Sequence, residues 1–178
     1  MKKIYLHFVL FTCIFKCQVA WAQMPILDWS RCYGGNISDW GEYIFPLQDG
    51  GAIVTGSSYS DNGDVSGHHS NGYYLGYDYW VARMKADGTI TWQKSYGGTL
   101  TDLGRGIVQP DPEHFVISGY AWSNDDDISG NHGDYDVWLM KIDTSGNLIW
   151  GKTYGGTAED DIVLAQVDRI VRPLLQAH

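Results

Sequence analysis

Short runs of apolar and β-branched residues, separated by turn residues, recur along this chain at the length of β-strands. Asp87-Gly88 and Ser145-Gly146 each lie between two such runs, and both pairs favour a hairpin turn because glycine accepts a positive φ. The pattern predicts two sets of four antiparallel strands. The predicted strands are 42–45, 52–55, 80–84, 89–93, 105–108, 115–118, 138–142 and 147–150.

The strands belong to an internal repeat. The motif Trp-x-x-x-Tyr-Gly-Gly begins at Trp29, Trp92 and Trp150, with spacings of 63 and 58 residues. An acid follows each tryptophan by ten residues, and Gly and Ile positions recur without a gap in the first two copies. The acids are Asp39, Asp102 and Asp160. The first copy carries five extra residues between His69 and Asp78, which we interpret as a loop insertion.

A four-stranded antiparallel unit repeated in tandem, with aromatic and glycine positions in register, is typical of a β-propeller blade. The sequence therefore predicts an all-β fold made of tandem four-stranded antiparallel blades of a β-propeller. A β-sandwich or a β-solenoid is the alternative. The chain contains about two to two and a half blades, whereas propellers close with four to eight.

The repeat resembles a known family. The units approximate the form Gly-Gly-(apolar)-Val-x-Gly, then Asn/Asp-Gly-Asp-Val-Ser-Gly, then Asp-Tyr-Trp-(apolar)-x-Lys-x-Asp-x-x-Gly and the Trp and Tyr-Gly-Gly positions above. This pattern is similar to the β-propeller repeats of secreted and surface proteins best known from Bacteroidota, often found with a C-terminal sorting domain for secretion. The resemblance covers residues 29 to about 161 and implies a secreted propeller. It implies no enzymatic activity.

We divide the chain into three parts. Residues 1–22 are predicted to be a signal peptide, residues 23–161 to be propeller repeats with units starting near 29, 92 and 150, and residues 162–178 to be a divergent tail. The repeat fails soon after Asp160, so we expect a truncated piece of a longer protein that needs further blades or a second copy to complete the fold. Alternatively, the tail forms a weak amphipathic segment that covers an open edge.

The N-terminus predicts export. A basic start at residues 1–3 precedes the apolar run 4–15 and the small-x-small cleavage signature Ala20-Trp21-Ala22. The run is short for a transmembrane helix, and Cys17 lacks the small preceding residues that a lipoprotein would need. Cleavage after Ala22 would leave Cys32 as the last cysteine, and we expect it to be a small buried side chain.

The composition narrows the partners. The chain of 178 residues has 12 Lys and Arg against 21 Asp and Glu, for a net charge of −9. This acidic balance argues against a surface for nucleic acid or anionic lipid. Unknown proteins or glycans remain as partners.

Two acidic loops are the best candidates for a metal. Oxygen side chains at the first, third and fifth positions, followed by Gly, resemble the opening of a calcium loop. A carboxylate at the twelfth position completes only the second loop. The candidate calcium ligands are Asp125, Asp127, Ser129 and Asp136 in the second loop, and Asn62, Asp64 and Ser66 in the first. The alternative is that these side chains simply cap a turn by binding their own backbone amides.

Few other residues point to chemistry. His69 and His132 occupy equivalent repeat positions, which favours a hydrogen bond within each loop over catalysis or zinc. The motifs of serine hydrolases, phosphate-binding loops and zinc proteases are absent from the sequence. Trp40 and Trp122 are not matched by Trp in the other copy, so they are free to serve a glycan. We therefore expect a secreted, non-catalytic structural or interaction module, with an extracellular carbohydrate-binding or carbohydrate-cleaving propeller as the alternative.

Overall fold

A computed structural model of the chain describes residues 28–69 and 76–160. These residues form eight β-strands and no helix, so no helix in this part of the chain could span a membrane. The strands are β1 (Asp39–Pro46), β2 (Ala52–Ser58), β3 (Asp78–Met84), β4 (Ile90–Tyr96), β5 (Asp102–Asp111), β6 (His114–Ala121), β7 (Asp136–Asp143) and β8 (Leu148–Tyr154). The predicted all-β class and each of the eight predicted strands are confirmed, with longer bounds in most cases.

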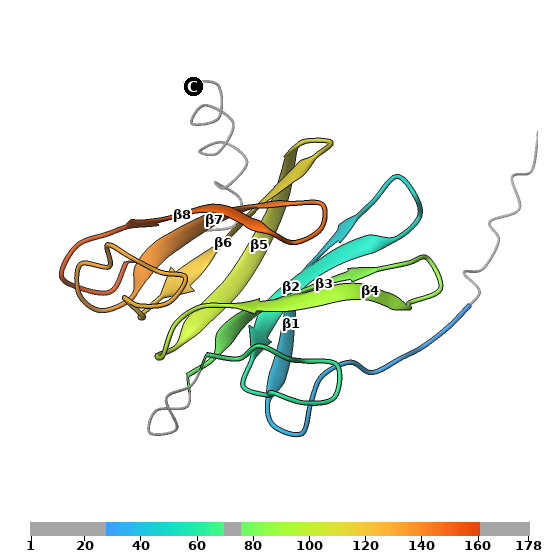
Figure 1. Ribbon diagram of the computed structural model, residues 1–178, viewed down its shortest axis with the longest axis horizontal. Helices are drawn as coiled ribbons and strands as arrows, with labels where there is room; N and C mark the ends of the chain where they lie inside the picture. Colours follow the sequence, from blue (N-terminus) through green and yellow to red (C-terminus); the bar gives the residue numbers. More distant parts are fainter. Residues whose placement is uncertain (1–27, 70–75, 161–178) are drawn as a thin grey trace, which may run out of the picture.

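The strands form two four-stranded antiparallel sheets, in the orders β1-β2-β3-β4 and β5-β6-β7-β8 (Figure 1). Each sheet is therefore a meander in which every strand pairs with its neighbours in sequence. The register of the first pair shifts between Gly41 and Tyr43, and that of the equivalent pair shifts between Gly104 and Gly106. The repeat thus preserves even an irregularity of strand pairing.

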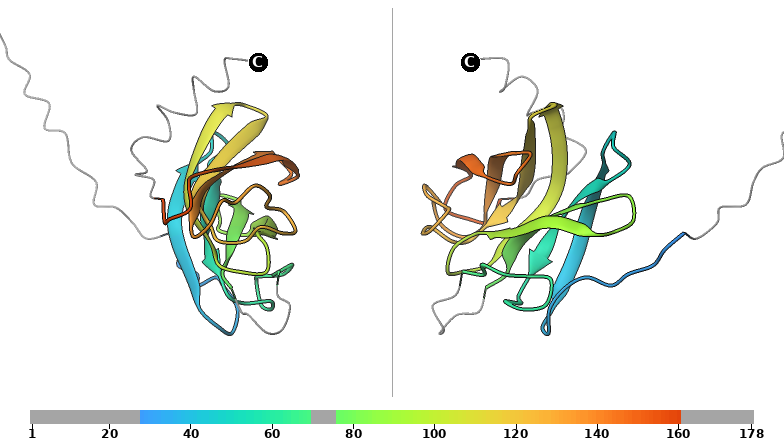
Figure 2. Two further views of the ribbon diagram at one scale, coloured as in Figure 1. Left: turned by 90° about the vertical axis from the view of Figure 1, so that its left-hand side faces the viewer. Right: turned by 45° about the vertical axis from the view of Figure 1, so that its right-hand side comes forward.

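The main core lies between the two sheets, where β5 approaches β1, β2 and β3 (Figure 2). Tyr79 of the first sheet packs edge-on against Trp138 of the second, with ring centroids 4.7 Å apart, and its hydroxyl donates to the Trp138 carbonyl at 3.2 Å. Ile53 and Val81 from the first sheet meet Ile117 from the second in the same cluster. Burial of these side chains is the main attraction between the sheets.

The sheets pack head to tail, because the two faces that meet come from different sides of the repeat. The first sheet contributes Ile53, Tyr79 and Val81 to this core. The residues that the second sheet contributes are equivalent to residues on the opposite face of the first sheet. On the second sheet, the positions equivalent to Ile53 and Val81 are Val116 and Leu139, which form a separate cluster away from the first sheet. On the first sheet, the face equivalent to the packed face of the second holds the cluster of Val65, Trp80, Ala82 and Met84. The stack therefore ends in two different faces, each equivalent to one that is packed inside it.

Cys32 corrects one expectation, since it is exposed rather than buried. It lies in the segment before β1, beside the first sheet, and no other sheet of the described residues covers this segment. The predicted signal peptide and the tail 162–178 lie outside the described residues.

Candidate functional site

The loop after β6 and the start of β5 together hold the segment that follows β4, through four consecutive backbone amides. Gly97 to Leu100 each donate an N–H to a different side chain, and we call this arrangement the amide latch. The four hydrogen bonds are Gly97 to Asp127 (3.3 Å), Gly98 to Asp102 (2.8 Å), Thr99 to Asp125 (2.9 Å) and Leu100 to Ser123 (2.9 Å). The latch satisfies amides that no strand pairs.

The first unit contains the same latch. Its donors are the amides of Gly34 to Ile37, and its acceptors lie in the loop after β2 and at the start of β1. The bonds are Gly34 to Asp64 (3.2 Å), Gly35 to Asp39 (2.7 Å), Asn36 to Asn62 (2.9 Å) and Ile37 to Ser60 (3.1 Å). The acid ten residues after each Trp is thus an acceptor of the latch.

The Trp and Tyr of each repeat motif donate to the last hairpin turn of the sheet that follows the motif in sequence. The Trp92 indole donates to the Thr144 carbonyl at 3.0 Å, and the Tyr96 hydroxyl donates to the Gly146 carbonyl at 2.5 Å. In the preceding copy, Trp29 donates to Ala86 at 2.8 Å and Tyr33 to Gly88 at 2.5 Å. These bonds place the segment 29–33 against the first sheet as β4 lies against the second.

The predicted calcium ligands have different hydrogen-bond partners in the structure. Asp125 and Asp127 accept latch hydrogen bonds, as do Asn62 and Asp64 in the first unit. The Ser129 carbonyl accepts from Thr153, the Ser66 hydroxyl accepts from Gln93, and Asp136 lies at the start of β7 and accepts from His132. No group of three or more His, Cys, Asp or Glu side chains suited to a metal occurs within 28–69 and 76–160. Calcium binding by this loop stays a prediction, and it would draw on oxygens that here accept amide hydrogen bonds.

The two histidines form equivalent hydrogen bonds within their loops. His69 Nδ1 lies 2.8 Å from the Asp78 carboxylate, and His132 Nδ1 lies 2.9 Å from that of Asp136. Each histidine backbone N–H donates to the same carboxylate oxygen. The predicted loop hydrogen bond is therefore present in both units. The hydrogen bond to Asp78 raises the pKa of His69, against the lowering effect of its partial burial.

A buried carboxylate pair lies beneath the latch of the second unit. Asp78 and Asp102 are both fully buried, and an oxygen of each lies 2.8–2.9 Å from the point where a Cβ on Gly97 would stand. Burial raises the pKa of Asp102 to about 7, against the lowering effect of hydrogen bonds from Ser123 and Gly98, and the nearby Asp78 charge raises it further. Burial likewise raises the pKa of Asp78. One oxygen of Asp78 has no hydrogen-bond partner among the described residues. A proton on this buried carboxylate pair therefore stabilises the fold.

Exposed aromatic side chains form a rim at one end of the sheets. Trp122 contacts Tyr135 in a tilted arrangement with ring centroids 5.5 Å apart. The equivalent Tyr59 and Tyr77 lie 4.8 Å apart, with Trp40 beside Tyr77. Trp40 is 54% exposed and Trp122 is 43% exposed. Below this rim a pocket is lined by Leu103, Arg105, Tyr120, Tyr135 and Glu159. Aromatic faces beside charged groups are suited to a sugar ring.

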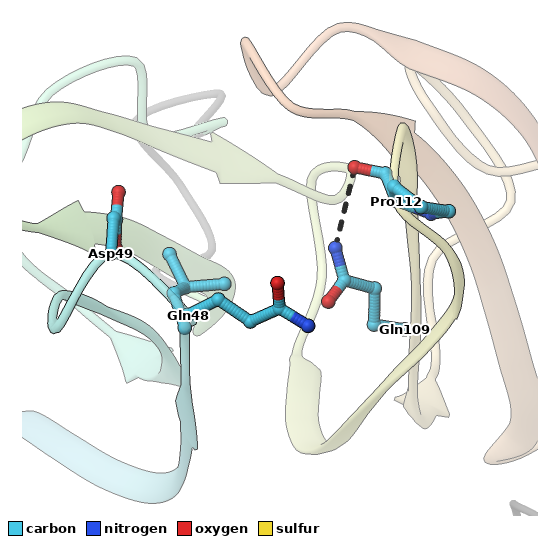
Figure 3. A pocket seen from close by; sticks show the side chains of 5 residues that line it. Gln48, Asp49, Gln109 and Pro112 are labelled. Carbon is cyan, nitrogen blue, oxygen red and sulfur yellow. Dashed lines mark hydrogen bonds between the residues drawn. The ribbon is translucent and has the colours of Figure 1, made fainter.

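A second hollow lies at the opposite turns, between the β1–β2 and β5–β6 connections (Figure 3). Figure 3 shows the Gln48 and Gln109 side chains in it, with Gln109 donating to the Pro112 carbonyl at 3.4 Å. Asp49 at its margin is paired with Arg83 at 2.6 Å. The hollow offers neutral amides rather than a reactive group.

The amide latch is the feature that sequence reasoning missed as a unit, although its residues are the ones singled out for calcium. The pattern Ser-x-(Asn/Asp)-x-Asp recurs at residues 60–64 and 123–127, in register with the Gly-Gly motif. The turn-capping alternative expected these side chains to bind amides of their own turn, whereas four of them accept from amides 26 or 30 residues away in the sequence. No protein-family model matches this chain, and no curated protein is similar to it.

Proposed function

We propose that this chain is a non-catalytic β-propeller module of a secreted bacterial protein, in which the units serve as a structural and interaction scaffold. The observation that carries the proposal is the head-to-tail packing of the two sheets. Each end face of the stack is equivalent to a face already packed inside it. The same packing step can therefore be repeated, and repetition of a four-stranded sheet around an axis gives a propeller.

The roles of the acids support a scaffold rather than an enzyme. The recurring acids Asp39, Asp102 and Asp160 each accept a hydrogen bond from the second glycine of the motif. Asp64 and Asp127 hold the first glycine of that motif in their own units. Acids with a repeated structural role in every unit explain their recurrence without a reaction.

The proposal is tested by lengthening the chain. Further copies of residues 99–156 are inserted after Gly156 to give proteins of three to eight units. If the units stack as a propeller, one length within four to eight closes the ring, and that protein shows a step in Tm together with a compact radius of gyration by X-ray scattering. A radius that grows steadily with each added unit, without a step in Tm, would contradict the proposal.

A second candidate function is carbohydrate binding, which the exposed aromatic rim favours. Trp122, Tyr135 and the adjacent pocket combine an aromatic platform with Arg105 and Glu159. The test is a titration of tryptophan fluorescence with a panel of soluble polysaccharides. Binding that is lost in Trp122→Ala, and retained in Tyr154→Ala as an exposed aromatic control, would support it. A signal that Trp122→Ala leaves unchanged would exclude this rim.

A further inference from the structure

Among the described residues, the Trp and Tyr of the third motif copy lack the hydrogen bonds to a hairpin turn that the first two copies make. Tyr96 is 3% exposed and donates to Gly146, whereas the equivalent Tyr154 is 42% exposed and its hydroxyl has no partner in the described part of the chain. The Trp150 indole likewise has no acceptor there. The β8 strand thus presents two hydrogen-bond donors that the repeat uses to hold a hairpin turn.

The amides after β8 are also without their acceptors. Within residues 154–160 the only latch bond is from Gly156 to Asp160 at 2.6 Å. The amides of Gly155, Thr157 and Ala158, which correspond to Gly97, Thr99 and Leu100, are exposed and have no acceptor among the described residues. The missing acceptors are a Ser-x-(Asn/Asp)-x-Asp loop.

The opposite end of the stack carries the matching surface. Ile44 of β1 is 63% exposed, whereas Ile107 at the same repeat position of β5 is 3% exposed in the core between the sheets. The cluster of Val116 and Leu139 on the second sheet is equivalent to the first-sheet residues in that core. A partner's cluster of this kind is therefore the surface that would cover Ile44.

At this end, a segment of the chain already occupies part of the place of a preceding unit. Residues 29–37 make the hairpin bonds through Trp29 and Tyr33 and the latch bonds through Gly34, Asn36 and Ile37. This segment belongs to no sheet, because the described residues contain no strand that pairs with it. It makes the polar contacts of an outer strand without the rest of the sheet, and leaves Ile44 uncovered.

We propose that a second copy of this chain docks head to tail at this end, with its β8 and residues 155–158 replacing residues 29–37 of the first copy. The exchange keeps the hydrogen bonds: Trp150 and Tyr154 take the place of Trp29 and Tyr33, and the loop Ser60–Asp64 accepts the incoming amides. It gains apolar burial, because an entire four-stranded sheet replaces a single segment that belongs to no sheet. Such a heterologous interface closes into a ring of identical chains when the rotation permits.

This inference rests on the proposed function for its packing geometry, but it fails separately. If the lengthened chains close and the natural chain does not associate, only the second copy as partner is wrong. If neither occurs, the propeller itself is wrong.

The test is native mass spectrometry and sedimentation of the purified chain over a range of concentrations. We expect a closed species of two to four chains, which corresponds to four to eight units. Because each copy carries a net charge of −9, association should strengthen as salt rises. A chain that stays monomeric at all concentrations and salt levels would overturn the proposal.

Two variants and a control locate the interface. Ile44→Asp should raise the dissociation constant at least tenfold, since it places a charge under the partner's apolar cluster. Tyr154→Phe, which removes only the hydroxyl donor, should raise it about three- to tenfold. Ile149→Asp is the control, because Ile149 is exposed on β8 and so is Thr91 at the same position of the packed unit. Equal effects of Ile44→Asp and Ile149→Asp would refute the proposed face.

Amide hydrogen–deuterium exchange distinguishes this replacement of segments from any other mode of association. On association, protection should move from the amides of residues 34–37 to those of residues 155–158. Protection of residues 34–37 that does not change on association would show that the segment is not replaced, and would overturn the proposal.

Discussion

Aspartate side chains decide the local structure of each unit, because they accept hydrogen bonds from amides that no strand can pair. In the second unit, Asp125 and Asp127 hold the segment after β4, and Asp102 holds it from the start of β5. The loop that contains the first two also includes Asp126 at a φ of 51°, where the first unit has Gly63. A positive φ is unfavourable for a residue other than glycine, and here it occurs between the two acceptors Asp125 and Asp127.

Replacing Asp127 with Ala should therefore destabilise the fold. The amide of Gly97 loses its acceptor in a buried position, at a cost of about 1–2 kcal/mol. For a chain of this length that lowers Tm by about 3–6 °C, measured by calorimetry. Glu113→Ala is the control, since it removes one charge from an exposed turn and should leave Tm within about 1 °C. A fall of the same size in both variants would mean that the latch bond contributes little.

Calcium is tested on the same variant. If the second loop binds calcium, the metal raises the Tm of the natural chain over that in chelator, because it stabilises the state that binds it. Asp125→Asn and Asp127→Ala should each abolish this rise. An identical Tm in calcium and in chelator would contradict calcium binding by this loop, and the latch would then be the role of these acids.

The buried carboxylates predict that stability falls as pH rises. The pKa of Asp102 is raised to about 7 in the fold, well above its value in an unfolded chain. The stabilisation that its proton supplies is complete below about pH 4 and is lost as pH rises through 7. The raised pKa values of Asp78 and His69 act in the same direction.

We therefore expect a Tm several degrees higher at pH 5 than at pH 8. Asp102→Asn should reduce that difference by at least half, whereas Glu113→Gln should not change it. A Tm that is higher at pH 8 in the natural chain would show that the hydrogen bonds to Asp102 outweigh its burial.

At the scale of the element, equivalent strands differ in burial according to what covers them. The strands β1 and β5 have matching glycines and matching register shifts, yet β1 is mostly exposed and β5 is mostly covered. The reason is that β5 packs against the first sheet, whereas within the described residues no sheet precedes β1.

The matched pair Ile44 and Ile107 measures this difference. Ile107→Ala removes a core side chain and should cost about 2–4 kcal/mol, which lowers Tm by about 5–15 °C. Ile44→Ala should change the Tm of the monomer by less than about 2 °C, since the side chain is largely exposed. Thermal unfolding at low concentration, where the chain is monomeric, makes the comparison. Equal losses would mean that a further element covers β1.

At the scale of the whole molecule, two head-to-tail sheets form a stack with unlike ends. The same face is buried in one unit and outermost in the other, so stability depends on what each end meets. This arrangement leaves each end of the stack able to pack against a further unit of the same kind.

The N-terminal residues predict export, and expression of the full-length chain tests this prediction. Expression with its own N-terminus in a bacterial host should give a protein outside the cytoplasm whose intact mass corresponds to a start at Gln23. Replacing Ala22 with Asp should prevent this cleavage and retain the longer mass. Recovery of the uncleaved chain in the cytoplasm would contradict the signal-peptide prediction.

The sequence by itself determined the units of this protein. Strand periodicity and hairpin glycines are local patterns, and the repeat is visible in the order of residues along the chain. It marked the acids, histidines and tryptophans that recur, and it located Trp40 and Trp122 as unusual. Only the tertiary structure decided what the acids bind, since Gly97 and Asp127 are 30 residues apart and meet through the fold. It also decided which face of each sheet is covered. Identical patterns at Ile44 and Ile107 cannot encode that difference, because burial depends on the neighbouring sheet and not on the residue.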